Sequence, residues 1–68
     1  MKSVSGKEFS RLLERKGWQL MRISGSHHIY GKNGCRERIS VPIHSGQSLK
    51  QGMLAYFLKV AGLTERDL

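Results

Sequence analysis

Two adjacent histidines, His27 and His28, have the clearest potential for catalysis in this sequence. They follow Gly25-Ser26, a pair typical of a chain reversal, and they open a segment of strand-like character. Because side chains alternate along a strand, we expect one ring on each face of a sheet and at least one ring in solvent. Histidine has an unperturbed pKa of about 6.5, so an exposed ring can accept and donate a proton near neutral pH.

RNA is a substrate for such a group because it carries its own nucleophile, the 2′-hydroxyl. A base that takes this proton allows attack on the adjacent phosphate without a metal ion, leaving a 2′,3′-cyclic phosphate and a free 5′-hydroxyl. Polar residues could hold the phosphate and stabilise the transition state; the candidates for RNA binding are Arg22, Ser26, Lys32, Arg36, Arg38 and His44. We interpret His44 as a phosphate contact or a loop residue rather than a second catalyst.

The charge of the chain also favours a nucleic acid. Twelve Lys and Arg against five Asp and Glu give a formal net charge of +7 in 68 residues, which makes a polyanion the expected partner. The basic residues are spread along the whole chain, unlike those of a membrane-surface helix. No apolar run approaches the roughly 20 residues that span a bilayer, and no signal-peptide pattern opens the sequence. We therefore expect a cytoplasmic protein with no membrane partner.

Other chemistries have little support. The acids needed for a metal-dependent nuclease are scattered along the chain: Glu8, Glu14, Glu37, Glu65 and Asp67. The single cysteine, Cys35, has no partner for a disulfide and no spacing typical of zinc ligands, so we interpret it as a bystander. The sequence predicts neither a metal nor a cofactor.

The elements that must position these residues begin with a helix at about 6–16. Ser5 and Glu8 have capping-box spacing, Val4 and Phe9 have the spacing of a hydrophobic staple, and Gly17 is placed to end the helix. Short strand-like runs follow, at 18–23, at 27–32 and from about 36 to 43. Trp18 and Leu20 are expected on one buried face, and Tyr30 is either a core-edge residue or an aromatic near the site.

Turn-forming residues between these strand-like runs indicate tight hairpins. Asn33-Gly34 predicts a type I′ turn, in which both central residues need positive φ. Pro42 is expected at the end of the third strand or on an edge, because it lacks an amide donor.

A second helix is expected at about 49–61, capped by Ser48 with Gln51 in the capping-box position. Its apolar stripe comprises Leu49, Met53, Leu54, Phe57, Val60 and Ala61, and Gly62 ends it. The order predicts one α+β domain over residues 1–68, arranged α-β-β-β-α. Two helices should cover one face of a three-stranded antiparallel sheet, as in double-stranded RNA-binding domains.

The sequence resembles the HicA family of bacterial mRNA interferase toxins. The resemblance rests on Gly17-Trp18, on the run from Arg22 to Tyr30 that contains Gly25-Ser26-His27-His28, on Val41-Pro42-Ile43-His44, and on residues 49–63. It implies a type II toxin–antitoxin toxin, an endoribonuclease that cleaves mRNA and is neutralised by a HicB-type antitoxin covering the site. The family's catalytic histidine falls in the Gly-Ser-His segment, which matches His27 or His28, with His27 ranked slightly ahead.

Two other functions stay open. A non-catalytic RNA-binding module could use the same fold and charge without turnover. An interaction domain for an acidic protein would bind that protein and hardly any RNA. Cleavage of RNA in the presence of EDTA separates the first of these from a nuclease.

Overall fold

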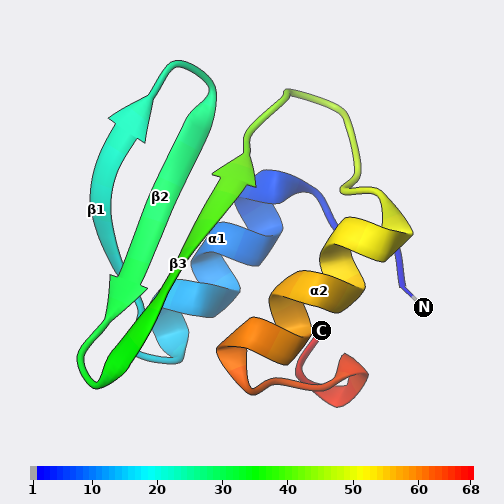
Figure 1. Cartoon of the computed structure of the whole chain (residues 1–68). Helices are drawn as coiled ribbons and strands as arrows, with labels where there is room; N and C mark the ends of the chain where they lie inside the picture. The colour runs from blue at the N-terminus through cyan, green and yellow to red at the C-terminus, as the bar shows by residue number, and fades with distance from the viewer. Residues whose placement is uncertain (1) are drawn as a thin grey trace.

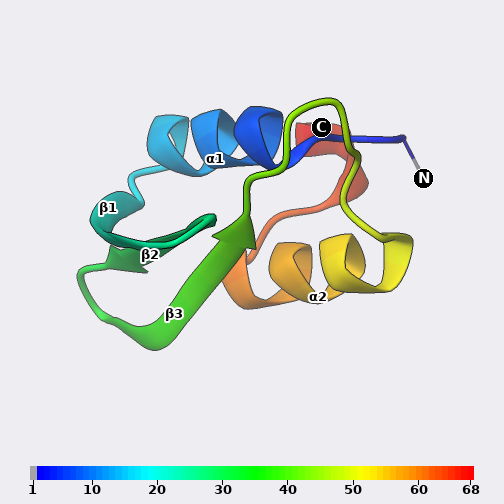
Figure 2. The same ribbon diagram turned by 90° about the horizontal axis from the view of Figure 1, so that it is seen from above.

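The elements follow the predicted order in the computed structural model, which describes residues 2–68. They are α1 (Gly6–Arg15), β1 (Gln19–Ser24), β2 (His27–Lys32), β3 (Cys35–Pro42), α2 (Gln51–Ala61) and a final 3₁₀ helix, η1 (Glu65–Asp67). The strands form one antiparallel sheet in the order β1-β2-β3 (Figure 1). Seen from above, α1 forms a layer behind the sheet and α2 lies alongside β3 (Figure 2). The predicted α+β fold is confirmed.

Both ends of α1 are fixed by the residues that the sequence indicated. The Ser5 hydroxyl accepts a hydrogen bond from the Glu8 amide at 3.1 Å, and the Glu8 carboxylate accepts one from the Ser5 amide at 3.0 Å. These bonds hold the pKa of Glu8 below its ordinary value. At the other end Gly17 has φ 94°, and the Trp18 amide donates to the Leu13 carbonyl at 2.9 Å. This Schellman-type ending turns the chain directly into β1.

One buried cluster holds the helices to the sheet. Its fully buried side chains come from α1, the sheet and α2 and are Phe9, Leu13, Tyr30, Ile39, Val41 and Leu54. The rings of Phe9 and Phe57 stack with centroids 5.6 Å apart, which joins α1 to α2. The buried Tyr30 hydroxyl donates to Glu14 at 2.7 Å, and burial raises the pKa of Tyr30. Tyr30 is therefore a core residue that stays protonated as a donor.

The predicted start of the second helix is wrong. α2 begins at Gln51, and its N-cap, Lys50, makes no side-chain cap hydrogen bond. Ser48 instead forms an isolated β-bridge with Ser5, and the Leu49 amide donates to the Val4 carbonyl at 2.7 Å. These backbone bonds hold residues 48 and 49 extended, so Ser48 cannot act as the cap.

Other packing predictions also need correction. Leu20 is 42% exposed, because β1 is an edge strand whose side chains all reach solvent, and Met53 is 37% exposed. Leu58 takes a place in the core that the predicted stripe did not include. The Asn33-Gly34 hairpin is present, but positive φ occurs at Gly34 and not at Asn33, which excludes a type I′ turn. Pro42 ends β3, an edge strand, as predicted.

A close backbone contact at Gly6 leads to a stability prediction. A Cβ on Gly6 would overlap the carbonyl oxygen of Pro42 and would lie 3.2 Å from Cδ1 of Ile43. Gly6→Ala is therefore expected to lower the free energy of unfolding by about 1–3 kcal/mol, measured by urea denaturation. Gly52→Ala is the matched control, because a Cβ there meets nothing within 4 Å, and it should raise stability by about 1 kcal/mol. An unchanged midpoint for Gly6→Ala would contradict this contact between α1 and β3.

Candidate functional site

His27 lies on the face of the sheet that the helices leave open. Its cross-strand partners are Ser24 on β1 and Pro42 on β3, and its side chain is exposed. The ring Nδ1 lies 3.1 Å from the hydroxyl oxygen of Ser40, the side chain diagonally across on β3. This hydrogen bond fixes the direction of an otherwise free imidazole through Nδ1, and Nε2 lies on the other side of the ring.

His28 points to the opposite face. It pairs with Val41, which is fully buried on the helix-facing side, and the His28 ring is half-buried. The adjacent histidines therefore occupy different environments, as strand alternation predicts. Of the two, His27 has the solvent access that a catalytic group needs.

A hollow of about 370 Å³ opens beside His27, between the end of the sheet and the start of α2. Its lining includes His27, Pro42, His44, Gln47, Lys50 and Met53. The hollow thus combines two imidazoles, a lysine and an amide with apolar walls. A nucleotide offers matching groups, because its phosphate is anionic and its base is flat and partly apolar.

The predicted RNA-binding residues divide into two groups. Near His27, Arg22 pairs with Ile29 and shares the open face, and His44 lines the hollow. Ser26 occupies the turn before His27, where its backbone carbonyl accepts a hydrogen bond from the Ile43 amide at 2.7 Å.

The remaining candidates lie at the opposite end of the strands. The Arg38 side chain covers Gly31, because a Cβ added there would lie 3.0 Å from the arginine Nε. Gly31 is four residues from His27 along β2, which corresponds to about 13 Å. Arg36 is exposed on the same part of β3. Lys32 runs toward the end of α1, 3.5 Å from a Cβ placed on Gly17. Lys32 therefore lies away from the His27 site.

Sequence reasoning missed three residues around His27. Ser40 orients the ring, and Gln47 and Lys50 line the hollow. Strand alternation was a usable signal for Ser40, because this residue lies between the apolar Ile39 and Val41, which are buried. Gln47 and Lys50 come from an irregular segment whose path depends on tertiary hydrogen bonds, so the pattern carried no signal for them.

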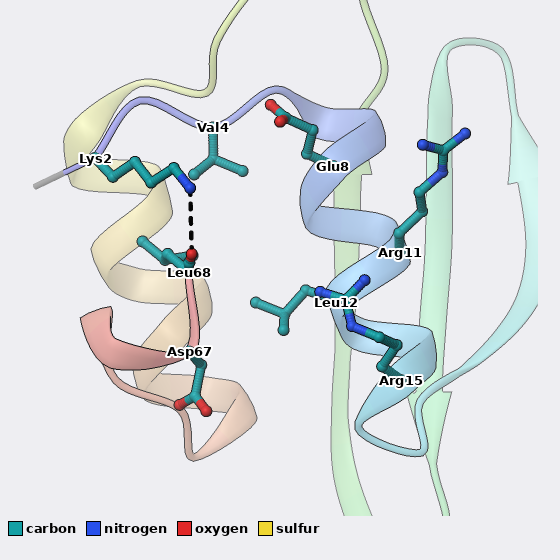
Figure 3. Close-up of a pocket in the computed structure, with 8 residues that line it drawn as sticks. All are labelled: Lys2, Val4, Glu8, Arg11, Leu12, Arg15, Asp67 and Leu68. Carbon is teal, nitrogen blue, oxygen red and sulfur yellow. Dashed lines mark hydrogen bonds between the residues drawn. The ribbon is translucent and has the colours of Figure 1, made fainter.

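A second hollow lies between the N-terminal segment, α1 and the C-terminal turn (Figure 3). The Lys2 ammonium donates to the carbonyl of Leu68 at 3.4 Å across it. Asp67 accepts from the Thr64 amide at 2.9 Å and pairs with Lys16 at 3.2 Å, and these contacts lower the pKa of Asp67. These contacts join the two ends of the described chain to each other and join the C-terminal turn to Lys16, the C-cap of α1.

Two observations concern metals and membranes. Within residues 2–68, no three His, Cys, Asp or Glu side chains are grouped so that they could hold a metal ion. The helices in this range are too short or too polar to cross a bilayer.

Comparison with known proteins gives the family. The model of the HicA toxin of bacterial toxin–antitoxin systems matches residues 6–63, which contain every helix and strand of the fold except η1. A search of curated proteins found no match. The family match spans most of the 68 residues and includes His27, Ser40, His44 and Lys50. The chain therefore belongs to the HicA family of bacterial toxins.

Proposed function

We propose that this toxin is an endoribonuclease that cleaves mRNA, with His27 as the general base. The observation that carries the proposal is the exposed His27 ring, which is oriented by Ser40 and lines a hollow of about 370 Å³ together with His44 and Lys50. The base removes the proton of an RNA 2′-hydroxyl, and the resulting oxygen attacks the adjacent phosphorus. The reaction needs no metal ion, since the nucleophile is part of the substrate.

The hydrogen bond between His27 and Ser40 supports this role, because it can favour the imidazole tautomer with its proton on Nδ1. A neutral ring whose Nδ1–H donates to the Ser40 oxygen has its lone pair on Nε2, which faces away from the bond. Nε2 is then the atom that takes the 2′-hydroxyl proton. Ser40 thus acts as a positioning residue for the base.

The charge distribution supports binding of an RNA strand along the open face. Arg22, on the same face as His27, and Lys50, which lines the hollow, would hold the phosphate that reacts at His27. Arg36 and Arg38, farther along the sheet, would contact neighbouring phosphates of the same strand. A net charge of +7 adds long-range attraction for RNA.

Membership in a toxin–antitoxin family implies an antitoxin partner. We propose that this partner is a HicB-type protein that neutralises the toxin in the cytoplasm by covering the hollow beside His27. Acidic groups on it would compete with phosphate for Arg22 and Lys50, and opposite charge would speed association.

Cleavage of a long single-stranded RNA in the presence of EDTA tests the proposed activity. We expect metal-free cleavage, with 2′,3′-cyclic phosphate and 5′-hydroxyl ends identified by mass spectrometry. DNA of the same sequence should bind but stay intact, because it lacks the 2′-hydroxyl nucleophile. Binding of RNA without any cleavage would instead favour the non-catalytic RNA-binding module, and cleavage of the DNA would contradict the mechanism.

A further inference from the structure

Two histidines from different parts of the sequence line the hollow beside His27. His27 enters from β2, and His44 enters from the segment between β3 and α2. From its position two residues after Pro42, His44 was interpreted as a loop residue or a phosphate contact rather than a second catalyst. In the structure, His44 lines the same hollow as His27, so a second imidazole is available to a substrate bound there.

The backbone around His44 holds it close to His27. Pro42 is the cross-strand partner of His27, which sets their Cα atoms about 4.5–5.5 Å apart, and two residues of chain span at most about 7 Å. The Cα of His44 therefore lies within about 13 Å of that of His27. The Ile43 amide donates to the Ser26 carbonyl at 2.7 Å, which ties the residue before His44 to the turn before His27.

The segment after His44 is also fixed. The His44 carbonyl accepts from the Gln47 amide at 3.1 Å and closes a four-residue turn, with Gly46 at φ 75° in the position that tolerates left-handed backbone. Farther on, the Leu49 amide donates to the Val4 carbonyl at 2.7 Å. His44 is exposed, yet it sits on backbone held from both sides.

We propose that His44 is the general acid of the proposed ribonuclease, an inference that rests on that function. In the reaction, the 2′-hydroxyl proton passes to Nε2 of His27, and a bond forms between the 2′-oxygen and phosphorus. The bond from phosphorus to the 5′-oxygen breaks, and protonated His44 gives its proton to that oxygen. The products are the 2′,3′-cyclic phosphate and the 5′-hydroxyl, and proton exchange with water returns both rings to their starting states.

The hollow is compatible with one histidine as the base and the other as the acid. Attacking and leaving oxygens lie on opposite sides of phosphorus, and each needs its proton-transfer group within about 2.6–3.2 Å. Rings that enter one hollow from two different segments can approach a phosphate from two sides. Lys50, the remaining cation of the lining, is available to balance the charge of the phosphate itself. His44 is then free for proton transfer.

A modified substrate distinguishes an acid from a phosphate contact. In a short RNA whose bridging 5′-oxygen is replaced by sulfur, the leaving thiolate needs no proton. We expect His44→Ala to cleave ordinary RNA at least about 100-fold more slowly than the unmodified protein, and to come within about tenfold of it on the sulfur substrate. His27→Ala should stay slow on both substrates, because it lacks the base.

Control variants keep the test decisive. Ser45→Ala changes the neighbouring exposed residue, which does not line the hollow, and should cleave both substrates normally. His44→Gln is measured in parallel as a variant closer in size to histidine, and circular dichroism verifies that each variant is folded. A rescue by sulfur of tenfold or more in the folded His44 variants supports the acid role, and a smaller rescue overturns it. If the unmodified protein cleaves neither RNA, the proposed function itself fails before any variant is compared.

Discussion

Replacing His27 with alanine is expected to slow RNA cleavage by at least about 100-fold without unfolding the protein. The ring is exposed and its hydrogen bond to Ser40 lies at the surface, so its loss removes little packing. The cleavage rate is measured on a labelled RNA in EDTA, and the free energy of unfolding by urea denaturation. In cells, expression of the unmodified toxin should arrest growth, and expression of His27→Ala should not.

His28→Ala is the matched comparison, since the two histidines are adjacent on one strand. The His28 ring is half-buried on the helix-facing side beside Val41, so its removal should affect stability more than the chemical step. We expect a loss of cleavage below about tenfold once the variant is folded. The opposite pattern, with a slow His28→Ala and an active His27→Ala, would transfer the base role to His28.

The sequence could predict the fold because its strongest signals are local. The capping box at Ser5 and Glu8 and the glycine at 17 satisfy backbone groups within one or two turns of α1, and no distant contact opposes them. The start of α2 depends on contacts with the far end of the chain. Ser48 pairs with Ser5, which lies 43 positions away and is invisible to a local pattern.

For the candidate site, the sequence could predict the positions of the two histidines on the sheet. Strand alternation correctly predicted that His27 and His28 lie on opposite faces, and the catalytic role of the Gly-Ser-His segment stays a prediction. Their surroundings depend on the register of β2 and β3, which shifts between Tyr30 and Lys32. Between Tyr30 and Lys32, β2 has one residue, whereas β3 has three residues between their partners Ile39 and Cys35. The two extra residues of β3 shift the pairing, so that Pro42 lies beside His27. The sequence of the strands contains no pattern from which this register shift could be predicted.

Phe57 offers the largest expected effect on stability. Its side chain is 6% exposed, and its ring stacks on the fully buried Phe9, so that one aromatic pair joins the two helices. Phe57→Ala should lower the free energy of unfolding by about 3–5 kcal/mol, through lost burial and the cavity left behind. A core in a chain of this size rarely supplies more than about 3–5 kcal/mol in total. The variant is therefore expected to be largely unfolded at room temperature.

Tyr56→Ala is the control that distinguishes the loss of a buried aromatic ring from the loss of an exposed one. Tyr56 is 62% exposed, and its centroid lies 6.2 Å from that of Phe57. Tyr56→Ala should therefore cost less than about 1.5 kcal/mol, the upper end for an aromatic pair. Urea denaturation followed by the fluorescence of Trp18, a single and buried tryptophan, measures both variants. Phe57→Leu, which fills part of the cavity, should fall between Phe57→Ala and the unmodified protein. Equal losses for Tyr56→Ala and Phe57→Ala would show that α2 does not pack through the face that contains Phe57.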